Sequence, residues 1–335
     1  MPRIEIIPFE TGLLPQAAAL LAARHERDRA AMPLLPAEFS ATEGAERAIR
    51  AALDRTAASG VAAVLDGRVI AYLIGDRQIS EVWGRSGWVR ASACAYDLDL
   101  GPEIVRDLYA ALAADWVEAG IFYHIVLLPA TDRALFDRWV SLSFGVEQVH
   151  ALLGLREVDD PPEKLPAGVT IRRATPTDRD AISAMSDVIW RVQTRAPVWG
   201  IMLPEQVAET AEGWGELVDD ETVMLWAAEV EGEIVGSQAY WPAASTFDQM
   251  WIPEDSVHLS VAGTRPALRG RGIGRALTQV GLAAARDAGH PICETDWRST
   301  NLLASRFWPR QGFEPAFYRM TRRVDSRILW ARGDA

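Results

Sequence analysis

The sequence predicts an α/β protein with mixed sheets, built from two tandem copies of one fold. Two observations lead to this prediction. The same order of elements occurs twice with a period of about 165 residues, as an internal duplication produces. In the second copy, a stretch rich in glycine and arginine, Arg269 to Gly274, joins an apolar strand to an amphipathic helix.

Composition places the chain among ordinary globular proteins. Its 335 residues suffice for about two domains, and 49% of them are hydrophobic and 24% charged. We expect a cytoplasmic protein without a membrane partner, because the sequence shows neither a bilayer-length apolar run nor a signal peptide at Met1 to Glu5. A net charge of −12 argues against a nucleic-acid partner. Cys94 and Cys293 lie in strand-like runs and are predicted to be buried thiols, and we expect no metal site.

The first copy is predicted to occupy residues 1–157. Its clearest feature is a hairpin, because Asp66-Gly67 separates two apolar runs and favours a two-residue turn. The predicted strands are Ile4–Phe9, Val61–Leu65, Val69–Ile74, Trp88–Tyr96, Phe122–Leu128 and Ala151–Glu157, and the predicted helices are Leu13–Arg29, Thr42–Ala58, Glu103–Ala119 and Asp132–Leu142.

A linker rich in proline and charge, residues 158–168, precedes the second copy at residues 169–335. A second hairpin is predicted around Glu231-Gly232. The predicted strands of this copy are Val169–Arg173, Val223–Glu229, Ile234–Trp241, His258–Ala262, Ile292–Asp296 and Phe317–Arg323, and its predicted helices are Asp178–Val192, Glu205–Leu217, Ile273–Ala288 and Asn301–Arg310.

The stretch Arg269-Gly270-Arg271-Gly272-Ile273-Gly274 is predicted to bind an anion. Its glycines carry no Cβ, so the N–H groups of the first helical turn can face a phosphate, and Arg269, Arg271 and Arg275 add positive charge. The spacing excludes a P-loop, which needs Gly-Lys-Ser/Thr, and a dinucleotide fingerprint, which needs G-x-G-x-x-G. A plain turn between strand and helix is the alternative interpretation.

Arg-x-x-Gly-x-Gly after a strand resembles the acyl-CoA pyrophosphate loop of the GNAT superfamily of N-acyltransferases. A second stretch, Asn301-x-x-Ala304-x-x-Phe307-Trp308-x-x-Gln311-Gly312-Phe313, is similar to the late helix of that family. The resemblance covers residues 169–323 and implies two tandem GNAT-like domains, with acetyl-CoA as the acyl donor. The cofactor contacts that it implies are Val261, Ala262, Gly263, Arg269, Gly270, Arg271, Gly272, Ile273, Gly274, Arg275, Asn301, Ser305 and Trp308.

Trp308 departs from the family pattern, which usually has tyrosine at this position. An indole N–H cannot serve as a general acid, so we expect the thiolate to leave without one, with Tyr318 or water as the alternative acids. Asn301 also suits a helix N-cap, a role that can coexist with a cofactor contact.

The first copy departs further from the pattern at its corresponding junction, Ala95 to Glu103. It has one glycine, no arginine and three acidic side chains, which would repel a pyrophosphate. The sequence therefore predicts a degenerate first copy without a cofactor site, as in tandem proteins that this plan resembles.

Acyl transfer to an amine requires a neutral nucleophile and a polarised carbonyl group. His258, on the strand before the loop, is the predicted base, and a histidine packed at a strand start is the alternative. Glu294 and Asp296 on the next strand are alternative bases or anchors for a cationic substrate. The resemblance implies that Val261 or a neighbour donates a backbone N–H to the thioester carbonyl.

Aromatic residues in two segments, 190–204 and 241–251, are predicted to line the acceptor pocket. They include Trp190, Trp199, Met202, Trp241, Phe247 and Trp251. Together with Asp296 and the acidic residues between Glu205 and Glu221, they favour a small primary amine over a protein lysine. Core packing is the alternative for each tryptophan. The alternative function is a non-catalytic acyl-CoA sensor, and the oligomeric state is not predicted.

Overall fold

The computed structural model describes residues 3–244, 246 and 249–331. It divides the chain into two compact units, each described here by itself. Unit 1 comprises Met1–Val149, Ser245–Pro253 and Pro315–Ala335, and unit 2 comprises His150–Ala244 and Glu254–Glu314. The units therefore differ from a linear division at residues 158–168, because segments of each copy belong to the unit formed mainly by the other.

Unit 1 is built on a mixed sheet in the order β1-β2-β3-β4-β6-β13, followed by the first part of β7, with β5 paired to β3. Its strands are β1 (Glu5–Pro8), β2 (Ser59–Leu65), β3 (Arg68–Ser80), β4 (Gly84–Val89), β5 (Cys94–Tyr96), β6 (Tyr123–Pro129) and β13 (Glu314–Arg323). Its helices are α1 (Leu14–Ala31), α2 (Thr42–Leu53), α3 (Ile104–Glu118), α4 (Arg133–Ser141) and α10 (Ile328–Ala331).

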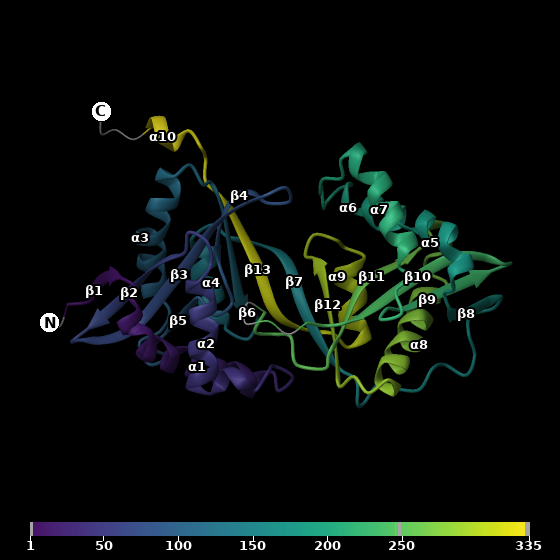
Figure 1. Cartoon of the computed structure of the whole chain (residues 1–335), viewed down its shortest axis with the longest axis horizontal. Helices are drawn as coiled ribbons and strands as arrows, with labels where there is room; N and C mark the ends of the chain where they lie inside the picture. Colours follow the sequence, from purple (N-terminus) through teal and green to yellow (C-terminus); the bar gives the residue numbers. More distant parts are fainter. Residues whose placement is uncertain (1–2, 245, 247–248, 332–335) are drawn as a thin grey trace. The chain divides into compact units, whose positions relative to one another are not determined.

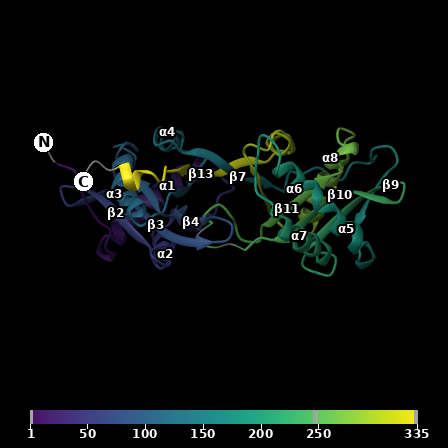
Figure 2. The same cartoon turned by 90° about the horizontal axis from the view of Figure 1, so that it is seen from above.

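Unit 2 is built on the second part of β7 (Gly145–Gly154) followed by β12-β11-β10-β9-β8. Helices α5 to α7 lie over one face of this sheet and α8 over the other (Figures 1 and 2). The strands are β8 (Val169–Arg173), β9 (Met224–Val230), β10 (Glu233–Pro242), β11 (Val257–Thr264) and β12 (Ile292–Arg298), and the helices are α5 (Arg179–Met185), α6 (Asp187–Gln193), α7 (Pro204–Glu216), α8 (Ile273–Asp287) and α9 (Ala304–Phe307).

The predicted repeat of element order is confirmed, and so are both predicted hairpins. Asp66 and Gly67 adopt φ of 51° and 79°, and Glu231 and Gly232 adopt φ of 53° and 84°. Two successive residues with positive φ match the right-handed twist of the flanking strands, which is why such pairs make tight hairpins.

Several predicted elements are interrupted or shorter. Residues 88–96 form the end of β4 and then β5, and residues 178–192 form the separate helices α5 and α6. The helix predicted at 42–58 ends at Leu53, and the one predicted at 301–310 is α9 followed by a 3-10 turn, Trp308–Gln311. Pro309 explains this last change, because it has no N–H to continue an α-helical ladder.

The last strand of each copy joins, in whole or in part, the unit formed mainly by the other copy. β13, the last strand of the second copy, pairs antiparallel with β6 from Phe317↔Pro129 to Arg323↔Tyr123. β7 spans Gly145–Gly154, so it both starts and ends before the predicted 151–157. Polar residues can take part in its start because Arg319 donates hydrogen bonds to Glu147 at 2.6 Å and to Gln148 at 3.2 Å. Its residues from His150 onward belong to unit 2.

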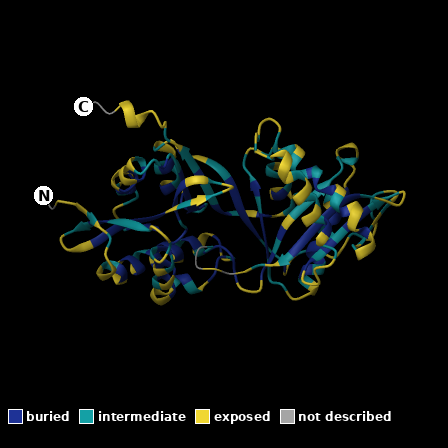
Figure 3. Ribbon diagram, turned by 45° about the horizontal axis from the view of Figure 1, so that its top comes forward, coloured by how far each residue is buried: buried dark blue, intermediate teal, exposed yellow. Residues whose placement is uncertain are grey.

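A buried polar chain fixes α8 to the sheet of unit 2. Tyr240 Oη donates to Gln238 Oε1 at 2.7 Å, and Gln238 Nε2 donates to Thr278 Oγ1 at 2.8 Å. Gly281 lets the helix lie against the Tyr240 ring, since a Cβ at this position would come within 2.4 Å of Tyr240 Oη. Figure 3 shows these central strands as buried and the outward faces of the helices as exposed.

The thiols of Cys94 and Cys293 are buried and unpaired, as predicted, and burial raises the pKa of Cys94 to about 12. Among the described residues, no helix combines the length and the apolar character needed to cross a membrane.

Gly281→Ala should destabilise the protein by about 1–3 kcal/mol in urea unfolding, because its methyl group overlaps the Tyr240 ring. Gly213→Ala is the matched control: it lies in α7 with nothing within 4 Å of its Cβ, and should stabilise by about 0.5–1 kcal/mol. Equal effects of the two substitutions would contradict this packing.

Candidate functional site

Strands β11 and β12 separate within the sheet of unit 2. They pair in parallel at Val257↔Cys293, His258↔Glu294 and Leu259↔Thr295, whereas β11 continues beside β10 as far as Thr264. A register shift in the β10 pairing leaves Ser260 between the partners of Tyr240 and Ala239, as a β-bulge. Ser260 is exposed, and Val261, Ala262 and Gly263 are partly exposed. The central sheet therefore opens at these residues.

The glycine loop ends at an uncapped helix N-terminus. Gly270 and Gly272 have φ of 78° and 82°, which glycine adopts without strain, and α8 begins at Ile273 without a side-chain cap. The first N–H groups of a helix have no intrahelical acceptor, so those of Ile273 to Arg275 can bind a ligand anion. Arg271 and Arg275 are exposed beside them.

Arg269 has a different place from the other two arginines. Its Nε donates to the Thr264 carbonyl at 3.1 Å, and partial burial lowers its pKa. This contact ties the end of β11 to the start of the loop.

The second motif lies beside the loop. A Cβ on Gly274 would lie 3.4 Å from Thr264 Oγ1 and 3.9 Å from the Phe307 ring, so α9 borders the first turn of α8. Asn301 Oδ1 accepts from the N–H groups of Leu303 and Ala304 at 3.1 and 3.3 Å. Asn301 thus caps the turn that leads into α9, and its amide NH₂ is not used by these two bonds.

The other residues predicted on this motif differ in exposure. Ser305 is partly buried, one turn after Asn301. Trp308 is 6% exposed, with its ring 4.9 Å from that of Phe307 and 5.5 Å from that of Phe313. Trp308 is thus a packing residue at this position, and its contact with a cofactor stays a prediction.

His258 and Glu294 form a pair one residue before the last paired residues of the two strands, Leu259 and Thr295. His258 Nδ1 contacts Glu294 Oε2, and because a carboxylate accepts, Nδ1 carries the proton. The His258 side chain is 30% exposed and that of Glu294 is 2% exposed. The accessible side of the imidazole is therefore the side away from Glu294, which carries Nε2.

The pair stabilises its own charged state. Burial alone would lower the pKa of His258, but the hydrogen bond and charge of Glu294, with the charge of Asp296, raise it above its usual value. Burial alone would raise the pKa of Glu294, but interactions with His150 and His258 lower it. Glu294 is therefore an ionised carboxylate behind the histidine.

His150 was not among the predicted site residues. It lies on β7 in the first copy, and its Nδ1 is 3.6 Å from Glu294 Oε1, within ion-pair range and beyond a hydrogen bond. The only sequence signal was a titratable residue inside the apolar run Val149 to Leu152. Among the described residues, no group of three or more His, Cys, Asp or Glu side chains is arranged to hold a metal ion.

Tyr318, the alternative general acid, lies on β13 in unit 1. Its ring is 5.6 Å from that of Phe136, and partial burial raises its pKa. The role of Tyr318 as a general acid stays a prediction.

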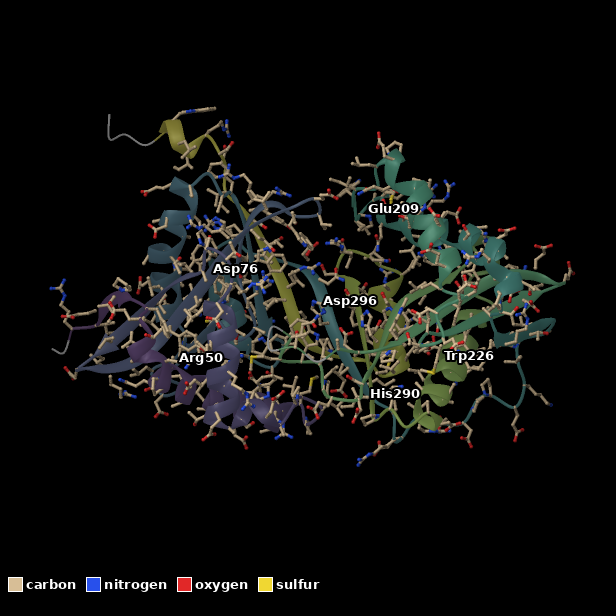
Figure 4. All side chains as sticks on the ribbon, in the orientation of Figure 1. Arg50, Asp76, Glu209, Trp226, His290 and Asp296 are labelled. Atoms are coloured by element: carbon tan, nitrogen blue, oxygen red, sulfur yellow. The ribbon has the colours of Figure 1, made fainter. Side chains whose placement is uncertain are left out.

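The predicted acceptor residues have unequal exposure. Trp199 is 72% exposed at a φ of 48°, in the segment between α6 and α7. Trp190 is partly buried with Arg191 4.6 Å from its ring centre, and Trp241 is partly buried against the core near Ile182. Asp296 is partly exposed on β12 (Figure 4).

Helix α6 brings this segment to the opening, since a Cβ on Gly263 would lie 3.0 Å from Val188. In contrast, Trp251 is 2% exposed and packs against Phe317 in unit 1. It is a core residue, which was the alternative interpretation for each tryptophan. Phe247 lies outside the described residues.

At the corresponding junction of the first copy, arginines neutralise two of the three acids. Asp97 pairs with Arg68, and Glu103 pairs with Arg106 at 2.8 Å and Arg138 at 2.6 Å. These hydrogen bonds lower the pKa of both carboxyl groups. The absence of a cofactor site in this copy stays a prediction.

Residues 190–313 match the family model described as "Acetyltransferase (GNAT) family". The chain is 30% identical over 228 residues to a mycothiol acetyltransferase of Tsukamurella paurometabola, covering 64% of this chain and 69% of that protein. A mycothiol acetyltransferase of Kytococcus sedentarius is 31% identical over 168 residues, or 47% of this chain and 49% of that protein.

Two solved structures share the fold over nearly the whole chain. A GCN5-related N-acetyltransferase from Sphaerobacter thermophilus has a TM-score of 0.57 at 18% identity, covering 96% of both chains. A tandem GNAT protein from the clavulanic acid biosynthesis pathway has a TM-score of 0.50 at 15% identity, covering 97% of this chain and 99% of its own.

The chain therefore has the fold of a tandem GNAT protein, with an opening between β11 and β12 in unit 2. The chain belongs to the GNAT acetyltransferase family.

Gly272→Glu should abolish the binding of acetyl-CoA in calorimetry, because it places a carboxylate at the N-terminus of α8, where a phosphate would bind. Gly232→Glu is the matched control, with a φ of 84° against 82° and no atom near its Cβ. Both substitutions carry the same backbone strain, so equal binding by the two variants would contradict the anion site.

Proposed function

We propose that the protein transfers an acetyl group from acetyl-CoA to a primary amine of a small molecule, by direct attack in a ternary complex. The observation that carries this proposal is the position of the His258–Glu294 pair, two residues before the bulge at Ser260 where the sheet opens. The proposed proton acceptor lies on β11, and the proposed anion site lies at the start of α8, the next α-helix along the chain.

In this mechanism the neutral amine attacks the thioester carbonyl carbon, forming a C–N bond. His258 Nε2 takes the amine proton directly or through a water. A backbone N–H at Val261 or a neighbour stabilises the oxyanion, and its collapse breaks the C–S bond. The thiolate leaves without a general acid and takes a proton from water, which agrees with the buried indole of Trp308.

Glu294 acts in this mechanism as the group that orients His258, and the burial of its carboxylate supports this role over that of base. Asp296 and Trp199 are the side chains we propose for the acceptor, an aromatic surface and a carboxylate that suit a protonated amine. Relatives named for the acetylation of mycothiol support a small-molecule acceptor.

An acceptor panel tests the proposal. Acetyl-CoA consumption should depend on a small amine, among aromatic amines, polyamines, aminoglycosides and amino acids, and should be weak with lysine peptides. Trp199→Ala should raise KM for the preferred amine about tenfold, and the control Trp330→Ala, at a tryptophan of unit 1 that is also largely exposed, should not. Acetylation of peptides alone would refute the small-molecule acceptor, and binding that protects the thioester without turnover would indicate a sensor.

His258→Gln should lower kcat by about 10²–10⁴-fold with little change in KM for acetyl-CoA. In the native protein kcat/KM should rise with pH through an apparent pKa above 6.5, because the charge of Glu294 outweighs burial and favours the protonated imidazole, which is not a base. Glu294→Gln should move this limb to lower pH. An unchanged pH profile in His258→Gln would remove His258 from the mechanism.

A further inference from the structure

The two oxygens of the Glu294 carboxylate face two imidazoles from different strands. Oε2 contacts Nδ1 of His258 on β11, and Oε1 lies 3.6 Å from Nδ1 of His150 on β7. The side chains of His150 and Glu294 are 11% and 2% exposed, against 30% for His258. His258 is therefore the more accessible imidazole of the two, and His150 lies beside the buried carboxylate.

When His258 is in the neutral form that can accept a proton, the buried carboxylate of Glu294 loses a neighbouring positive charge. His258 must be neutral to accept a proton, and in that form it offers Glu294 a hydrogen bond but no positive charge. A buried ionised carboxylate needs more compensation than this, or it binds a proton itself. A protonated Glu294 would donate to Nδ1 of His258, which would move the imidazole proton to Nε2 and remove the lone pair that faces the acceptor.

We propose that His150, supplied by the last strand of the first copy, is a positioning residue that keeps Glu294 ionised while His258 is neutral. It thereby holds His258 in the tautomer with the proton on Nδ1 and the lone pair on Nε2. The inference rests on the proposed role of His258 as the base. Among the described residues, the charged or titratable groups that act on the His258–Glu294 pair include His150 on β7, and Cys293 and Asp296 on β12.

The test reads the His258 tautomer directly, in the full chain and without substrates. In ¹⁵N NMR, with the signals of the five histidines assigned by His258→Gln, neutral His258 should carry its proton on Nδ1 in the native protein. In His150→Leu the proton should shift to Nε2, and kcat should fall about 10- to 100-fold with an unchanged KM for acetyl-CoA. In His150→Gln, whose amide donates to Oε1, the native tautomer and most of the activity should return.

His290→Gln is the matched control, because His290 lies in the same unit with its Nδ1 on the Asp255 carbonyl, and it should leave the His258 signals unchanged. A folded His150→Leu protein with native His258 tautomer would overturn the inference. If His150→Leu does not fold, His150→Gln decides, since a shift to the Nε2–H tautomer in that variant would also overturn it. Activity that survives His258→Gln would refute the role of His258 as the base. The effect of His150→Leu on the His258 tautomer would still test the further inference by itself.

Discussion

The short parallel pairing of β11 and β12 is the constraint on which the site depends. Three residue pairs bring His258 beside Glu294, and one residue later the strands part at the bulge of Ser260. The same register therefore sets the proton acceptor and the opening in the sheet. A slip by one residue would turn His258 to the other face and separate it from its carboxylate, since strand side chains alternate with a period of two.

The cationic character of the glycine loop depends on the contacts that fix α8 on the sheet more than on the net charge of the chain. The chain carries a net charge of −12, yet its loop presents two exposed arginines and an uncapped helix N-terminus. Gln238 and Thr278 fix the helix on the sheet, and Arg269 fixes the strand end that leads into it. Local geometry thus makes a cationic site on an anionic protein, because such fields act within about a Debye length, ~8–10 Å.

Features encoded by neighbouring residues were predictable from the sequence, as the two hairpins, the glycine loop and the repeated element order show. His258 and Glu294 were each predicted as site residues, but their contact was not predicted. The pairing register of two strands separated by a helix cannot be deduced from the sequence of either strand. His150 had only a weak signal, a titratable residue in an apolar run, because its approach to Glu294 depends on β7 lying beside β12. Pro309 was a local signal that the last helix would be interrupted, and it was available in the sequence.

The exchange of the last strands makes the first copy part of both sheets, although its own junction at Ala95 to Glu103 has one glycine and no arginine. Deleting that copy would remove the strand beside β12 and with it His150, and would leave β12 as an unpaired edge open to association with other chains. Deleting the second copy would remove β13 from beside β6. A gene that encodes this chain can therefore drift in the ligand-binding residues of one copy, whereas recombination that separates the copies would yield two incomplete sheets.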